Sequence, residues 1–199
     1  VAPQKTKEPV LPFDEQTYKL AYDVFLENRN LEDALRTAQA AVKQSPQNMV
    51  WRERLAHVAE WSGRSQLALD NWLFIAQGTQ REDAWKAVMR MSPGLFDDHA
   101  LTAGTLHLLQ QRPNDPALLR SLVESYERQG TPQNAIDYLL HHGKSPEALV
   151  MLARVAERDG QTRLALDTWK RVFEIPEQRT PAHAMAAASM ALLEGEPDL

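Results

Sequence analysis

Two clusters of side chains in this sequence have residue types suited to metal binding or acid–base chemistry. They are Asp97-Asp98-His99 and His141-His142. Metal ligands must converge on one point, and the helical zinc motif achieves this with two histidines four residues apart on one face. Neither cluster has that spacing. We therefore expect Asp97 and Asp98 to cap the positive end of one helix, and His141 to close the negative end of another.

The remaining sequence lacks the motifs of common enzymes and cofactor sites. It contains no glycine-rich phosphate loop and no nucleophile elbow, and its serines stand where helix caps are expected. It contains no cysteine, which excludes disulfides and thiolate metal sites. We predict no catalytic residue, no metal site and no cofactor, and hence no enzyme activity.

Charge and hydropathy narrow the choice of partners. The 199 residues carry a net charge of -5, whereas attraction to phosphate backbones needs clustered Lys and Arg, so nucleic acid is not an expected partner. No apolar run approaches the roughly 18 residues that span a bilayer, so no membrane segment is expected within this chain. The composition, 43% hydrophobic and 25% charged, is that of a folded domain.

An internal repeat predicts the elements that position these side chains. Residues 55–72 recur at 152–169 with eleven of eighteen positions identical. In the first copy, small and apolar residues follow the three-and-four spacing of one helix face on either side of Gly63. The unit is therefore a helix hairpin, with a left-handed turn at Gly63 and Ser65 accepting from the free amides of the second helix.

Other copies of this hairpin have similar residues at their turns and helix starts. The aligned turn positions are Asn30, Gly63, Gly130 and Gly160. Helix starts are expected where Pro follows a capping side chain, at Ser45-Pro46, Asp115-Pro116, Ser145-Pro146 and Thr180-Pro181.

The unit of about 34 residues resembles the tetratricopeptide repeat. The matching residues are Leu55, Ala56, Gly63, Ala68 and Trp72, then Leu122, Tyr126, Gly130 and Ala135, then Leu152, Ala153, Gly160, Ala165 and Trp169. The resemblance implies an all-α fold, a right-handed α-solenoid of antiparallel helix hairpins with about five repeats plus a terminal helix. We expect an extended leader over 1–13, a solenoid over 14–199, repeats at about 14–47, 48–79, 80–114, 115–145 and 146–179, and a partial repeat over 180–199.

Two irregularities are visible in the spacing. The third repeat replaces its turn glycine with residues 92–96, so its hairpin is expected to be opened or reangled. Gly130 and Gly160 are only 30 residues apart, about one helical turn short of a full repeat, and we expect the second helix of the fourth repeat to stop near His141.

Resemblance to the family also implies a concave groove lined by the first helices. The groove positions are Glu53, His57, Glu60, Lys86, Arg90, Arg120, Glu124, Glu127, Arg128, Arg154, Glu157 and Arg158. Co-chaperones of this family hold a peptide carboxylate with a set that includes two asparagines, which are missing here. The arginines can still fork to carboxylates on a partner. The alternative is that Arg and Glu pair within and between repeats, at about 0.5 kcal/mol per exposed pair.

The tryptophans divide between core and groove. Trp72, Trp85 and Trp169 fall on packing positions of the hairpins, while the role of Trp51 is open. Trp61 falls near the end of a first helix at a groove position. It is either a platform for a partner side chain or sugar ring, or a half-buried surface residue.

These features favour a non-enzymatic protein–protein interaction scaffold. Residues 83–101, with 68–77 before them, resemble the periplasmic repeat region of the PelB family, which exports Pel-type bacterial exopolysaccharide. That resemblance implies a periplasmic location within a larger envelope protein, with a polysaccharide-modifying enzyme or export component as partner. The alternatives are a cytoplasmic adaptor that binds a peptide, and a module that binds exopolysaccharide directly, with Trp61 and the carboxylates Glu53, Glu60, Glu124 and Glu127 attracting a cationic polymer.

Overall fold

A computed structural model describes residues 13–196 of the chain, and this part is all-α, as the repeat predicts. Contacts divide the chain into two compact units, Val1–Met91 and Ser92–Leu199, and the boundary falls within helix α5 (Glu82–Leu95). Within 13–196 no strand is present.

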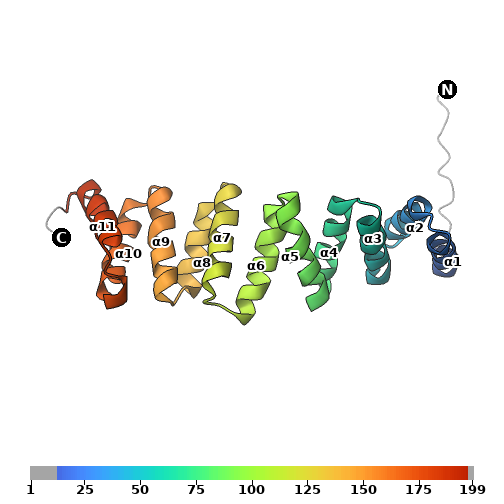
Figure 1. Cartoon of the computed structure of the whole chain (residues 1–199), viewed down its shortest axis with the longest axis horizontal. Coiled ribbons are helices and arrows are strands. Elements are labelled where there is room, and N and C mark those ends of the chain that lie inside the picture. Colours follow the sequence, from blue (N-terminus) through green and yellow to red (C-terminus); the bar gives the residue numbers. More distant parts are fainter. Residues whose placement is uncertain (1–12, 197–199) are drawn as a thin grey trace, which may run out of the picture. The chain divides into compact units, whose positions relative to one another are not determined.

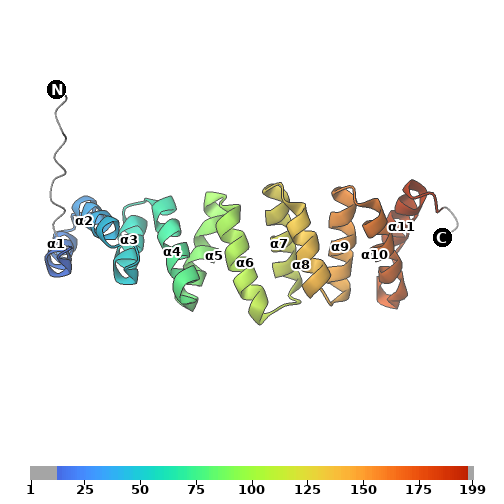
Figure 2. The same ribbon diagram turned by 180° about the vertical axis from the view of Figure 1, so that it is seen from behind.

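The first unit contains two helix hairpins and the start of α5. Its helices are α1 (Glu15–Glu27), α2 (Leu31–Gln44), α3 (Met49–Trp61) and α4 (Ser65–Thr79). Consecutive helices pack on one another, and α3 and α4 lie side by side in Figures 1 and 2. Ala56 and Ala68 are fully buried, and their small side chains permit a close approach of the two helix backbones.

An aromatic cluster closes the first repeat against the second. Trp51 is fully buried, and the rings of Phe13, Tyr18 and Tyr22 lie 5.9 to 6.4 Å from it in edge-on geometry. The Arg54 guanidinium lies 4.5 Å from the Trp51 ring. Trp51 is thus a core residue. Phe13 belongs to this cluster, and residues 1–12 of the expected leader lie outside the described residues.

The second unit contains a single helix, two hairpins and a final helix. They are α6 (Asp98–Gln111), α7 (Pro116–Arg128), α8 (Pro132–His142), α9 (Pro146–Arg158), α10 (Thr162–Glu174), the short 3-10 helix η1 (Pro176–Gln178) and α11 (Pro181–Leu193). Consecutive helices from α6 to α11 pack on one another. One apolar cluster runs through them and includes Leu122, Leu152, Ala165 and Trp169.

Helix starts follow the expected chemistry at three of the four Pro sites. Asp115, Ser145 and Thr180 are N-caps whose side chains accept backbone amides, each before a first-turn Pro. The expectation at Ser45-Pro46 is wrong. Helix α3 starts three residues later because the Asn48 side chain accepts the amides of Val50 and Trp51.

Two further local expectations need correction. Ser65 makes no capping hydrogen bond, because α4 begins at Ser65 and the preceding Arg64 occupies the cap position. In the first hairpin the left-handed residue is Arg29, with φ 57°, rather than Asn30. Asn30 instead caps α2 by accepting the Asp33 amide. Arg29 and Asn30 thus correspond to Gly63 and Arg64 of the next hairpin, where Gly63 has φ 69° and Arg64 is the N-cap residue.

The link between α5 and α6 also differs from a glycine turn. Helix α5 continues through Pro93 and Gly94 to Leu95. Phe96 adopts the left-handed conformation with φ 54°, and its side chain is 89% exposed. The Asp97 amide donates to the Ser92 carbonyl at 3.1 Å, and Asp97 caps α6 by accepting the Ala100 amide at 2.9 Å. The expected capping role of Asp97 is confirmed.

The fourth repeat is short, as the glycine spacing predicts. Helix α8 ends at His142 after 11 residues and is followed by Gly143, whose amide donates to the Leu139 carbonyl. A Cβ at Gly143 would lie 2.7 Å from that carbonyl oxygen and 3.0 Å from the Ala148 Cβ. The short link thus requires glycine for space and not for a positive φ. Helices α7 and α9 pack directly on each other.

Candidate binding surface on the first helices

The predicted groove residues share one set of positions on the first helices. Positions four residues apart hold Glu53, His57 and Trp61 on α3, Arg120, Glu124 and Arg128 on α7, and Arg154 and Arg158 on α9, while Lys86 and Arg90 lie on α5. Residues four apart lie on one helix face. All these side chains are exposed or half-buried, as a binding surface requires.

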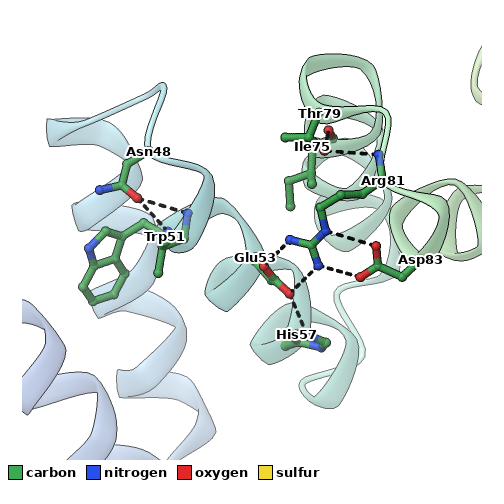
Figure 3. Close-up of polar contacts among 9 residues, drawn as sticks. Asn48, Trp51, Glu53, His57, Ile75, Thr79, Arg81 and Asp83 are labelled. Atoms are coloured by element: carbon green, nitrogen blue, oxygen red, sulfur yellow. Dashed lines mark hydrogen bonds and ion pairs between the residues drawn. The ribbon is translucent and has the colours of Figure 1, made fainter.

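The Glu53 carboxylate, on α3 in the first unit, is held by Arg81. The Arg81 guanidinium donates to both oxygens of Glu53, at 2.8 and 3.0 Å, and to both oxygens of Asp83, at 3.1 and 2.5 Å (Figure 3). His57 Nε2 lies 4.0 Å from Glu53 Oε1. The hydrogen bonds from Arg81 lower the pKa of Glu53 and of Asp83, although partial burial of Glu53 opposes the shift.

Glu60 also has partners within the first unit. Its Oε1 accepts the Trp72 indole N–H at 2.6 Å, and its Oε2 accepts from Arg90 at 2.8 Å. Both oxygens are therefore used within the repeat array. Arg90 was predicted as a partner-binding residue, but its guanidinium forms an ion pair with Glu60.

Trp61 presents the exposed aromatic surface of this unit. Its side chain is 57% exposed, while Trp72 and Trp85 are buried as expected. The His57 ring stacks on Trp61 with centroids 5.7 Å apart and an interplanar angle of 20°. The edge of the same imidazole meets Trp72 at 4.9 Å. Contacts with Trp61 and Trp72 thus hold the His57 ring in place, while the Trp61 indole stays largely exposed.

Ion pairs link neighbouring helices in the second unit in the same way. The Arg128 Nε and Nη2 atoms donate to Asp98 Oδ1 at 2.9 and 2.7 Å, which raises the pKa of Arg128. Arg158 Nε donates to Glu127 at 2.7 Å. In each pair the arginine follows its carboxylate by 30 or 31 residues, as Arg90 follows Glu60. Pairing between neighbouring elements, the alternative considered for the groove charges, therefore accounts for these arginines.

Two groove arginines differ from this pattern. Within residues 13–196, no carboxylate oxygen lies within 4.0 Å of the Arg120 or Arg154 guanidinium, and neither group makes a side-chain hydrogen bond. Arg154 also lies four residues before Arg158 on α9, an arrangement of like charges that costs a few tenths of a kcal/mol on a helix. Lys86 on α5 is likewise without an ion pair in the described part of the chain.

A pocket lies between α7 and α9, and both Arg120 and Arg154 line it. It has a volume of about 200 Å³ and is lined by Arg120, Val123, Glu124, Met151, Arg154 and Arg158. Val123 is buried and Met151 half-buried, so the pocket has an apolar base beneath charged walls. The structure thus brings together four of the predicted site residues from α7 and α9.

Sequence reasoning missed some of the residues that shape this surface. Arg81 precedes α5 and falls outside the groove spacing, so no periodic signal marks it, yet it holds Glu53. Val123 and Met151 follow the apolar core pattern, and nothing in their spacing distinguishes a pocket base from the core. Among the described residues, no group of three metal-ligating side chains is close enough to hold an ion.

Comparisons with known proteins give structural likenesses without a family assignment. No family model matches the chain, and no curated protein matches it either. A tetratricopeptide protein of Thermus thermophilus, TTC0263, has a solved structure similar to this one, with 21% identity over 90% of this chain and 100% of that chain and a TM-score of 0.40.

Two other solved structures illustrate the range of the likeness. A tetratricopeptide repeat protein from Parabacteroides merdae is 16% identical over 91% of this chain and 75% of that chain, with a TM-score of 0.39. The pilF protein of Pseudomonas aeruginosa is 13% identical over 92% of this chain and 85% of that chain, with a TM-score of 0.40. In residues 13–196 no helix has the length and apolarity needed to cross a membrane.

Proposed function

We propose that the protein is a non-enzymatic scaffold that binds another protein along its first helices. The observation that carries this proposal is the pocket between α7 and α9, where Arg120 and Arg154 face solvent without an ion-pair partner among residues 13–196, while other groove arginines are paired. Unpaired arginines around an apolar base are typical of a recognition surface.

The proposed setting is the periplasmic part of a Pel-type exopolysaccharide export machine. The support for it is the resemblance of residues 68–77 and 83–101 to the repeat region of the PelB family. In that setting the partner is a polysaccharide-modifying enzyme or another export component. A cytoplasmic adaptor remains the competing proposal, and fractionation of the protein expressed from its own gene separates the two. Recovery in the cytosolic fraction would contradict the periplasmic assignment.

Binding to a defined partner tests the scaffold function. The full chain is used to capture proteins from envelope and cytosolic extracts, and each captured protein is then purified and titrated against it. We expect saturable binding that weakens at least about tenfold when the unpaired groove side chains are removed together, in Trp61→Ala/Lys86→Ala/Arg120→Ala/Arg154→Ala.

A matched variant on the second helices controls for loss of charge. Lys43→Ala/Arg171→Ala removes two exposed cations from α2 and α10 and should bind the purified partner as the unmodified chain does. Equal affinity of the groove variant and the control variant would show that the first helices do not carry the function.

Direct carbohydrate binding is a second candidate, favoured by the exposed Trp61 face stacked on His57. The electrostatic part of that hypothesis is weakened. Glu53, Glu60 and Glu127 each pair with an arginine, and Glu124 lies 4.0 Å from Arg128. A sugar would therefore have to bind by stacking. Titration with neutral and cationic oligosaccharides tests this, and equal binding by Trp61→Ala would contradict it.

A further inference from the structure

We propose that the pocket between α7 and α9 binds an acidic side chain of a protein segment in which an aliphatic residue adjoins the acid. This inference rests on the proposed scaffold function and names the chemistry of one of its contacts. The carboxylate would lie between Arg120 and Arg154, and the aliphatic side chain would lie on Val123 and Met151.

The charge distribution favours an anionic ligand at this place. The chain as a whole is acidic, with a net charge of -5, so a local cluster of three arginines stands out from its surroundings. Arg158 is held by Glu127 at 2.7 Å, and Glu124 is turned toward Arg128 at 4.0 Å. Arg120 and Arg154 therefore keep their full donor capacity. A guanidinium has five N–H donors in a planar fork that matches a carboxylate, so an acidic ligand can replace the water around these exposed side chains with paired hydrogen bonds.

The two arginines share one pocket at the short fourth repeat. Helix α8 ends at His142, Gly143 permits an immediate return to α9, and α7 packs directly on α9. Arg120 lies at the second turn of α7 and Arg154 at the third turn of α9, so that both side chains line the same hollow. The pocket thus lies at the short repeat, where α7 and α9 are in direct contact.

The apolar base favours a protein segment over a free phosphate or a polyanion. Val123 and Met151 offer a surface that a phosphate group does not use, whereas an aliphatic side chain beside a carboxylate would bury it. A volume of about 200 Å³ is enough for one or two side chains and too small for a folded element. The overall negative charge also repels extended polyanions.

A synthetic peptide tests the inference on the full chain. The probe is the hexapeptide acetyl-GELELG-amide, titrated by calorimetry at low salt, where exposed charge attraction is strongest. We expect saturable binding to the unmodified chain that weakens at least about tenfold in Arg120→Gln and in Arg154→Gln. The peptide acetyl-GQLQLG-amide, which keeps the leucines, should not bind measurably.

Two further variants sharpen the result. Arg154→Lys keeps the charge and loses the fork, and should bind more weakly than the unmodified chain but more tightly than Arg154→Gln. Arg171→Gln removes an exposed charge from α10, outside the pocket, and should bind normally. The substituted arginines are exposed and unpaired, so all four variants are expected to stay folded, and circular dichroism checks this.

Three outcomes would overturn the inference. They are no binding of acetyl-GELELG-amide at low salt, equal binding by Arg154→Gln, and complete displacement of the peptide by inorganic phosphate at equal concentration, which would assign the pocket to phosphate. If the peptide fails while a purified partner still binds the unmodified chain, only this pocket assignment is lost. If no partner binds at all, the scaffold function itself fails.

Discussion

Individual charged residues on this surface separate into two groups according to their partners. Arg81, Arg90, Arg128 and Arg158 each meet a carboxylate from another helix or turn, at distances of 2.5 to 2.8 Å for the closest atoms. Such partly exposed pairs contribute little stability individually, but they fix the side chains in place. Residue type alone does not separate these arginines from the unpaired Arg120 and Arg154.

At this scale, Glu53 provides a prediction about pH. Its pKa is held below the ordinary value of 4.5 by hydrogen bonds from Arg81, so its ionised form stabilises the folded state. That stability is fully present above pH 4.5 and is lost as the pH falls through the lowered folded value. We expect Glu53→Gln to reduce the free energy of unfolding by about 1 kcal/mol at pH 7, and by much less at pH 3.

Urea unfolding of both proteins at pH 7 and pH 3 measures this difference. Glu27→Gln is the control, because Glu27 is exposed at the end of α1 and has no ion pair among the described residues. It should change the unfolding free energy by less than about 0.5 kcal/mol at either pH. A Glu53→Gln effect that is equally large at both pH values would mean that packing, and not charge, is responsible.

At the scale of helices and turns, the decisive element is the link between α8 and α9. Most turns in this chain place a residue at positive φ, as Gly63, Gly130 and Gly160 do. Gly143 is different, because its constraint is the space between the Leu139 carbonyl and Ala148. We expect the direct packing of α7 on α9 to depend on this turn being short.

Substitution of Gly143 tests that dependence. In Gly143→Ala the new methyl group would lie 2.7 Å from the Leu139 carbonyl oxygen, so the link must shift. We expect a loss of about 1 to 3 kcal/mol in unfolding free energy, measured by urea denaturation. Gly94→Ala is the matched control, because a Cβ there meets nothing within 4 Å and Gly94 lies in the last turn of α5.

Gly94→Ala should be neutral or stabilising by up to about 1 kcal/mol, since alanine is the better helix former. Equal effects of the two substitutions would show that the link has room to relax. The position of α7 relative to α9 would then not depend on Gly143.

Helix starts show how far the sequence determines these elements and where it stops. Where Pro follows a capping side chain and the next residues continue the apolar pattern, as at Asp115 and Ser145, the start is predictable. At Ser45-Pro46 a second capping residue, Asn48, competes from three positions later and forms the hydrogen bonds. Ser45 is instead the C-cap of α2, where its amide donates to the Ala41 carbonyl, so the start of α3 falls to Asn48.

The groove was predictable as a set of positions but not as a set of interactions. A fixed spacing identifies Arg120, Arg154 and Trp61 as first-helix surface residues, and the structure places them there. Which of the arginines meets a carboxylate depends on contacts between residues about 30 positions apart. Three of the pairs share a spacing of 30 or 31 residues, whereas Arg81 follows Glu53 by 28 residues and lies outside the groove positions, so its role was missed.

At the scale of the whole molecule, the chain behaves as repeated units in which packing is mainly between neighbours. Consecutive helices pack together in each unit, and the contacts group into 1–91 and 92–199. In such arrays, stability is close to a sum of repeat and neighbour contributions. Damage to one repeat should therefore stay local.

Hydrogen exchange on two matched substitutions tests this locality. Ala68 and Ala165 are both fully buried at the same position of their second helices, α4 and α10. A Trp at either position overpacks its hairpin, at a cost of about 1 to 3 kcal/mol or more. We expect Ala68→Trp to lower amide protection in α3 and α4 while leaving α9 and α10 nearly unchanged, and Ala165→Trp to do the reverse.

A uniform loss of protection in either variant would show that the two units unfold as one. Unchanged protection everywhere would mean that Ala68 and Ala165 do not face their neighbouring helices closely. The second result would also contradict the hairpin register derived from the repeat.

The unequal burial of the five tryptophans allows the intrinsic fluorescence of the protein to report on the α3 surface. Trp51, Trp72, Trp85 and Trp169 are at most 5% exposed, whereas Trp61 is 57% exposed. A soluble quencher such as acrylamide should therefore reach the fluorescence of Trp61 well before that of the other four. Protection of this emission when a partner is added would report contact with the α3 surface without any label, while a partner bound only at α7 and α9 would leave it unchanged.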